Sequence, residues 1–153
     1  MTILPVPVTE ALAVLNLPAD LASNSLFQEH TPLVMELLST YLEPASYAAL
    51  STSGDDEPSE ALATNARAAF CFLLLASTLE FLNLKTVGEG IVKVVGLDAS
   101  QTALLTGAEI EAFQSRLTRR ALSAITPWLS DAGHAALAAS FPSGPSGFRV
   151  ALI

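Results

Sequence analysis

The sequence predicts a mainly α-helical protein: a small helical bundle with one β-hairpin and a C-terminal extended strand. Three observations predict this fold class. Apolar residues recur at helical spacing in several segments, a valine-rich stretch with paired glycines interrupts them, and the last residues are apolar again. The 153 residues suit one domain. We expect a helical domain over residues 1–142, with the hairpin near 84–95, followed by a flexible arm over 143–153.

The first half of the chain contains short helical segments. TEALAVL, from Thr9, predicts the first, and ASYAALS predicts one or two further turns. Between them, a helix is expected over His30–Glu43, because Pro32 suits a first turn and Pro44 prevents simple continuation. Its apolar residues fall at i, i+3 and i+4 spacing: Leu33, Val34, Leu37, Leu38, Tyr41 and Leu42.

A long central helix is expected from Ser59 to about Asn83. Ser59 is a suitable N-cap, and Glu60 places a negative charge in the first turn, where the helix dipole favours it. The stretch AAFCFLLLA, residues 68–76, is apolar without a break. A membrane span needs about 20 such residues, and charged residues flank this shorter run. It therefore predicts a buried core helix.

The segment LKTVGEGIVKVVG, residues 84–96, changes from helical periodicity to β-branched residues around two glycines. This composition predicts a β-hairpin with its turn near Gly88–Gly90. The residues expected at the tip are Val87, Gly88, Glu89, Gly90 and Ile91.

Two more helices are expected after the hairpin. Thr106 and Glu109 form a T-x-x-E capping box, which satisfies two amide donors at a helix start. Pro127 breaks or kinks the pattern, because the residue before proline disfavours the α conformation, and a last helix is expected from there to Ser140. The apolar stripe of the first of these helices comprises Ile110, Phe113, Leu117, Ala121, Ala124 and Ile125.

Composition excludes several functions. The formal net charge is −8, which argues against a protein that reads or grips DNA, because such binding requires clustered Lys and Arg. Only 14% of the residues are charged, against an average of about 25%, which favours an oligomer or an assembly component. No membrane partner is expected.

The single cysteine, Cys71, excludes an intramolecular disulfide and a cysteine-based zinc site, and fits a reducing cytoplasm. The first twenty residues contain three prolines and no Lys or Arg, so no export signal is expected.

The residues that carry chemistry in other proteins form no recognisable catalytic or metal-binding pattern. His30 and His134 stand far apart with no second ligand nearby, and Cys71 lies within the apolar helix, where burial raises a thiol pKa. GEG at 88–90 lacks the third glycine of a dinucleotide motif, and the carboxylates of 55–60 lack EF-hand spacing. We expect no cofactor, no metal and no enzymatic activity.

Three basic residues are clustered in this acidic chain. Arg116, Arg119 and Arg120 stand at i, i+3 and i+4, so they share one side of a helix. They are either an exposed face with local pairing to Glu109 or Glu111, or a docking patch for an acidic neighbour, since arginine favours bidentate contact with carboxylates.

The C-terminal arm joins a Pro/Gly/Ser tether to GFRVALI. Its residues Phe148, Arg149, Val150, Leu152 and Ile153 are expected to make strand-type contacts. Two arrangements remain open. The strand either adds to the sheet of a neighbouring subunit or folds back on the 86–95 hairpin of its own chain.

The order of these segments resembles a known family. An early helix ending TYLEPASYAAL, a long helix NARAAFCFLLLASTLEFL and the hairpin LKTVGEGIVKV before a capped helix are similar to the head-tail connector proteins of tailed bacteriophages, also called adaptor or head-completion proteins. The likeness covers roughly Leu33 to Ile125.

The resemblance implies a structural virion protein at the neck, made in the host cytoplasm. Such a subunit forms a homo-oligomeric ring between the portal and the tail or neck proteins, and lines the passage for DNA, which it does not read. The alternative from the residues alone is a small helical regulatory or chaperone-like module that binds a partner peptide. An enzyme with scattered carboxylates is a third, weaker alternative.

Overall fold

The computed structural model describes residues 3–17, 19, 25–51, 57–85, 92–94, 102–104 and 107–141. The fold is mainly helical, as predicted. The elements follow one another as α1 (Val8–Val14), α2 (Ser25–Tyr41), α3 (Pro44–Ser51), α4 (Glu60–Lys85), β1 (Val92–Val94), β2 (Thr102–Leu104), α5 (Gly107–Ala124), the 3-10 turn η2 (Thr126–Trp128) and α6 (Asp131–Ala139).

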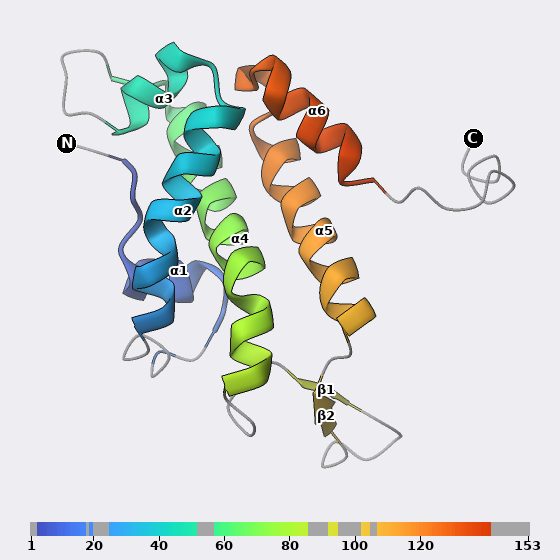
Figure 1. The fold of residues 1–153 in the computed structure, drawn as a ribbon. Helices are drawn as coiled ribbons and strands as arrows, with labels where there is room; N and C mark the ends of the chain where they lie inside the picture. Colours follow the sequence, from blue (N-terminus) through green and yellow to red (C-terminus); the bar gives the residue numbers. More distant parts are fainter. Residues whose placement is uncertain are drawn as a thin grey trace, which may run out of the picture.

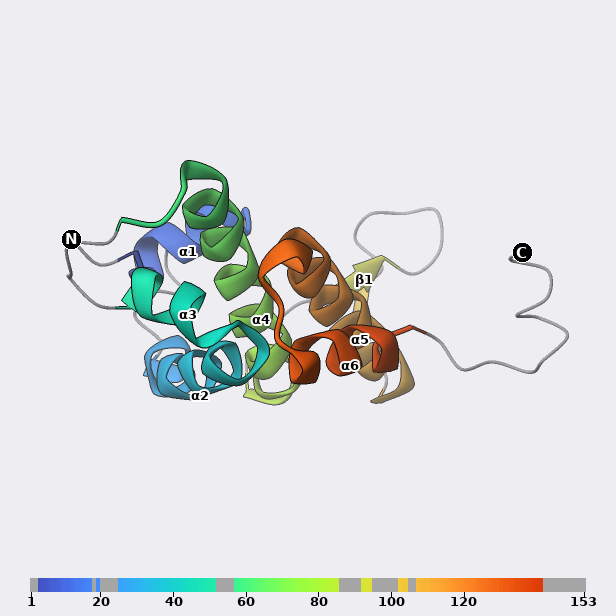
Figure 2. The same ribbon diagram turned by 90° about the horizontal axis from the view of Figure 1, so that it is seen from above.

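Helix α4 is the centre of the bundle (Figure 1). It packs most extensively against α5 on one side and α2 on the other, with α1 and α3 against its first half. Seen from above, α2 and α5 flank α4 (Figure 2). The largest side chains of the core are fully buried: Phe27, Phe70, Leu4, Leu12, Leu38, Leu42, Leu50, Leu74, Leu79, Leu122 and Ile125.

The start of α4 is the one predicted. Ser59 Oγ accepts a hydrogen bond from the Leu62 amide at 3.2 Å, as an N-cap does. By length and composition alone, Glu60–Leu79 passes the test for a membrane span, but 61% of its most apolar stretch is buried inside the protein. The packing of α1, α2, α3 and α5 around it accounts for that apolar composition.

Helix α2 begins five residues earlier than predicted. Pro32 lies inside it and not in its first turn, although an interior proline costs about 3 kcal/mol. The added turns bury Leu26 and Phe27 almost completely, and each such burial contributes about 1.5–3 kcal/mol. The burial of these two side chains together offsets the free-energy cost of the interior proline. Leu33, expected in the apolar stripe, is instead 45% exposed, because Val34 and Leu38 take the side that faces α4.

The two short N-terminal helices are confirmed. Helix α1 ends at Val14, and Asn16, two residues later, has a φ of 58°, the left-handed conformation that asparagine tolerates. Helix α3 begins at Pro44, where the missing amide costs nothing. The amides of Ile3 and Leu4 both donate to the Leu50 carbonyl, at 3.0 and 3.1 Å. These bonds hold the N-terminal segment against the end of α3.

Helices α5 and α6 do not meet where the sequence predicts. The apolar stripe of α5 is confirmed: Ile110, Leu117, Ala121 and Ile125 are buried. The last helix begins at Asp131 and not at Pro127, which lies in the 3-10 turn. The reason is Ser130, whose hydroxyl accepts from the Gly133 amide at 3.2 Å and so caps α6. Thr106, of the predicted capping box, lies outside the described residues.

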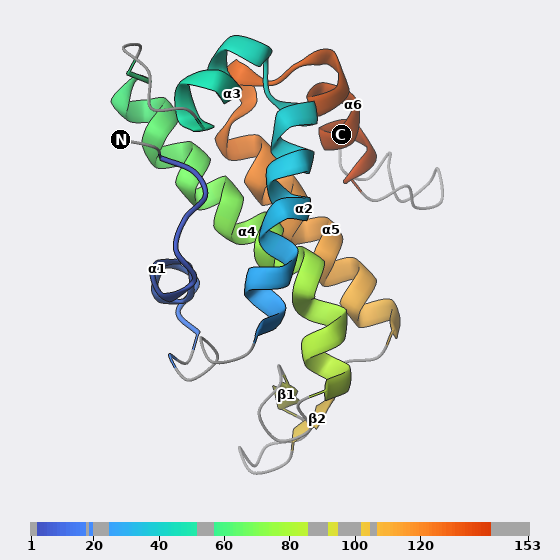
Figure 3. The same cartoon turned by 60° about the vertical axis from the view of Figure 1, so that its left-hand side comes forward.

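A hydrogen-bonded junction joins the end of α2 to the start of α6, side by side in Figure 3. The Ser130 amide donates to the Tyr41 carbonyl at 2.7 Å. Its hydroxyl donates to the Thr40 carbonyl at 2.7 Å, with the Tyr41 carbonyl at 3.0 Å. The Glu43 amide donates to the Trp128 carbonyl at 2.9 Å. Gly133 is buried directly against Tyr41.

The strands β1 and β2 pair antiparallel, with Val92 opposite Leu104 and Val94 opposite Thr102. The predicted hairpin near 84–95 is not confirmed in that form. Leu84 and Lys85, expected in its first strand, end α4, and β1 pairs with a later segment. The turn residues Val87, Gly88, Glu89, Gly90 and Ile91 lie outside the described residues, as does the C-terminal arm over 143–153.

Candidate protein-binding surface

The three predicted docking arginines lie on α5, and two of them contact aromatic rings from different parts of the fold. Arg119 is half-buried, and its guanidinium carbon lies 5.1 Å from the centre of the Phe141 ring, just after α6. Arg120 lies 4.8 Å from the centre of the Phe72 ring, on α4. Arg116 is exposed. Because consecutive residues of a helix point about 100° apart, the two neighbouring arginines reach rings that belong to different parts of the fold.

Each aromatic contact holds a guanidinium in place. Such a cation–π contact contributes about 0.5–1 kcal/mol at an exposed site and restricts a long side chain that is otherwise mobile. Phe141 keeps Arg119 beside Arg116 at the junction of α5 with the end of α6. We call Arg116, Arg119 and Phe141 the basic face. Arg120 belongs to the α4 side of the helix and is not part of it.

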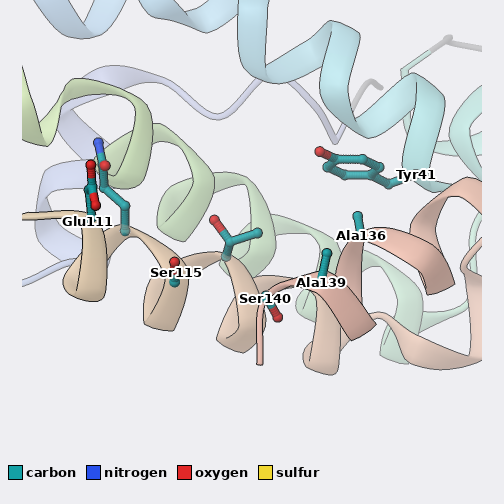
Figure 4. Close-up of a pocket in the computed structure, with 8 residues that line it drawn as sticks. Tyr41, Glu111, Ser115, Ala136, Ala139 and Ser140 are labelled. Carbon is teal, nitrogen blue, oxygen red and sulfur yellow. The ribbon is translucent and has the colours of Figure 1, made fainter. Parts of the chain in front are cut away.

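Two open cavities adjoin one another along the α5–α6 junction, each of about 480 Å³. The first is lined from α2, α5 and α6: Tyr41, Glu111, Gln114, Ser115, Thr118, Ala136, Ala139 and Ser140. Figure 4 shows the Tyr41 ring above Ala136 and Ala139, with Ser115 and Glu111 farther along α5. The second contains the basic face and shares Glu111, Ser115, Ala139 and Ser140 with the first.

The walls of these cavities are positioned by bonds that sequence spacing does not show. The Gln114 side-chain amide donates to the Ala76 carbonyl at 2.9 Å, which links α5 to the middle of α4. The junction at Ser130 fixes Tyr41 above α6. Mixed charge, a phenol and an apolar floor allow this surface to hold part of another protein through charge-assisted and apolar contacts.

Tyr41, Glu111 and Phe141 were not predicted to be parts of a contact surface. One signal was present: Glu111, Ser115 and Thr118 repeat at i, i+4 and i+7, a polar stripe beside the apolar stripe of α5. Nothing comparable marks Tyr41 or Phe141, because they reach the site from other helices.

The remaining candidate residues are placed apart from this surface. His30 lies inside α2 and His134 inside α6. Within the described ranges, no group of three or more His, Cys, Asp or Glu side chains is placed to hold a metal ion. Cys71 is fully buried, and desolvation raises its pKa from 9.0 to about 11, against a smaller opposing effect of the nearby Arg67 charge. Its thiol is therefore a core group, as predicted.

The strand residues of the arm, Phe148, Arg149, Val150, Leu152 and Ile153, lie outside the part of the chain that the structure describes, so their pairing stays a prediction. No protein-family model, no curated protein and no solved structure matches this chain, and its surface has to be interpreted from its own chemistry.

Proposed function

We propose that the protein is a structural virion component without enzymatic activity, a head-tail adaptor that forms a ring between the portal and the tail of a tailed phage. The order of its helical segments, which resembles that of connector proteins, supports this family. The observation that carries a binding role is the basic face. On a chain of net charge −8, Arg116 and Arg119 are gathered beside an exposed aromatic ring and an open cavity.

In this proposal the action of the protein is geometric. Helices of adjoining subunits pack around a symmetry axis, and the hairpin and the C-terminal strand fasten each subunit to the next or to the portal. The partners are copies of the same chain and the portal, tail or neck proteins. DNA passes as cargo, and the acidic net charge reduces its adhesion to the lumen.

The test is to measure the mass of the full-length protein, alone and mixed with the portal protein encoded by the same phage, by native mass spectrometry. An adaptor is expected to form a cyclic oligomer, alone or on the portal ring. A protein that stays monomeric and does not bind the portal would contradict the proposal. Fluorescence anisotropy with duplex DNA is a second measurement, and we expect no tight binding at physiological salt.

A second function is favoured by the cavity beneath Tyr41. A small helical regulatory or chaperone-like module would hold a partner peptide there. Such a protein is expected to remain a monomer or dimer in the same mass measurement, and to lose peptide binding when Ala136 or Ala139 is replaced by a bulky residue that fills the cavity.

A further inference from the structure

Helix α2 has an outward stripe whose charge is opposite to that of the basic face. Glu29 and Glu36 are spaced by seven residues within α2, so they align along one side of the helix, and Glu43 follows two residues after the helix ends. All three are exposed, and none forms an ion pair with another residue that the structure describes. Leu33 lies within the same stripe, one turn from Glu29. We call Glu29, Leu33 and Glu36 the acidic face.

The acidic and basic faces each combine charge with an exposed apolar group. The large apolar side chains that stand most exposed in the described ranges are Phe141 at 54%, Val14 at 53% and Leu33 at 45%. Two of these three lie on the two faces. A protein surface that pairs an apolar anchor with charges of one sign is typical of a contact site, because burial supplies affinity and charge selects the partner.

Within one molecule the two faces lie on different helices, and no ion pair joins them among the residues that the structure describes. Helices α2 and α5 lie on either side of α4, as Figures 1 and 2 both show. They are close in length, about 26 Å for α2 and about 27 Å for α5 at 1.5 Å per residue. One copy therefore offers the acidic face on α2 and the basic face at the second half of α5, on helices of similar length.

We propose that a second copy of this chain covers the basic face, with the acidic face of α2 packed against α5 of its neighbour. Glu36 then pairs with Arg116 and Arg119, and Leu33 packs against Phe141. Because the two surfaces differ, the contact is heterologous, and its repetition closes a ring or extends a filament. This inference rests on the proposed function and names the subunit contact of that ring.

The test uses full-length protein and sedimentation-velocity ultracentrifugation at low ionic strength, with two neutral double variants. E29A/E36A removes charge from the acidic face, and R116A/R119A removes it from the basic face. Each variant alone is expected to self-associate at least about tenfold more weakly than the parent protein. An equimolar mixture of the two is expected to form dimers and stop there, since each partner retains one working face.

Matched controls separate this contact from a general loss of charge or of stability. Glu60→Ala removes an exposed glutamate outside the acidic face, and Arg120→Ala removes the arginine that contacts the Phe72 ring of α4 and not Phe141. Both are expected to assemble like the parent. Circular dichroism checks that every variant keeps its helices. Mixing the charge-reversed variants E29K/E36K and R116E/R119E is expected to restore species larger than a dimer.

A parent protein that stays monomeric, a double variant that assembles normally, or a neutral mixture that stays monomeric would each overturn the proposed contact. Different results would refute the adaptor function and the proposed contact. Portal binding by a chain that does not self-associate, or rings unaffected by these variants, would refute the contact and leave the adaptor function standing. Failure to bind a portal, with the α2–α5 contact intact, would refute the adaptor function and leave the contact standing.

Discussion

Replacing Gly133 by alanine tests whether the junction of α2 and α6 is as tight as the structure indicates. A Cβ atom on Gly133 would overlap the Tyr41 carbonyl oxygen, and would stand 3.0 Å from the Tyr41 carbonyl carbon and 2.9 Å from Leu129 Cδ2. Backbone atoms cannot move aside as the end of a side chain does. The two helices must separate, which strains or breaks the bonds from Ser130 to Tyr41.

Gly133→Ala changes the free energy of unfolding through contributions of opposite sign. Overpacking costs about 1–3 kcal/mol, and each lost hydrogen bond costs about 1 kcal/mol. Alanine regains about 1 kcal/mol of helix propensity over glycine. We therefore expect Gly133→Ala to lower the free energy of unfolding by about 2–4 kcal/mol, and to lower Tm by about 10 °C for a chain of this length.

The assay is urea and thermal unfolding followed by circular dichroism. The control is Ala135→Gly, an exposed position of α6, where only propensity changes and about 1 kcal/mol is lost. A Gly133→Ala protein as stable as the parent, or more stable, would refute the close approach of α6 to Tyr41 and with it the geometry of the first cavity.

Three further predictions concern groups elsewhere in the fold. Burial raises the Cys71 pKa from 9.0 to about 11, so the unfolded chain loses the thiol proton first as pH rises. The free energy of unfolding is therefore expected to fall between pH 9 and about 11, by at most about 1.4 kcal/mol per pH unit. Cys71→Ala should remove that part of the pH dependence of stability, as measured by urea titrations. Arg67 and Glu10 form an ion pair but are 40% and 41% exposed, so a double-mutant cycle should give a coupling energy below about 1 kcal/mol, and a larger value would contradict a solvent-screened pair. Truncation after Ser143 should abolish assembly while Tm stays nearly unchanged, because the buried apolar residues of the described ranges fall between Leu4 and Leu129. A clear fall in Tm would favour pairing of the arm within its own chain.

Local patterns were sufficient for the helices and for part of the surface. The Ser59 cap, the apolar run of α4 and the stripe of α5 predict elements that the structure contains, because capping and helical periodicity act within a few residues. The spacing of Arg116, Arg119 and Arg120 likewise marks a basic segment. It does not show that Arg119 turns to Phe141 and Arg120 to Phe72, since those rings arrive from other helices.

What the sequence by itself determined is therefore the helical class, the core stripes, the inert thiol and the cluster of basic residues. Tertiary packing decided the rest. Burial of Phe27 allows α2 to continue across Pro32, and the cap at Ser130 makes α6 begin at Asp131. Tertiary packing also pairs β1 with β2. The physical reason is that these outcomes depend on burial and hydrogen bonds between residues far apart in the chain, whose free energy exceeds the local preference of a single proline or glycine.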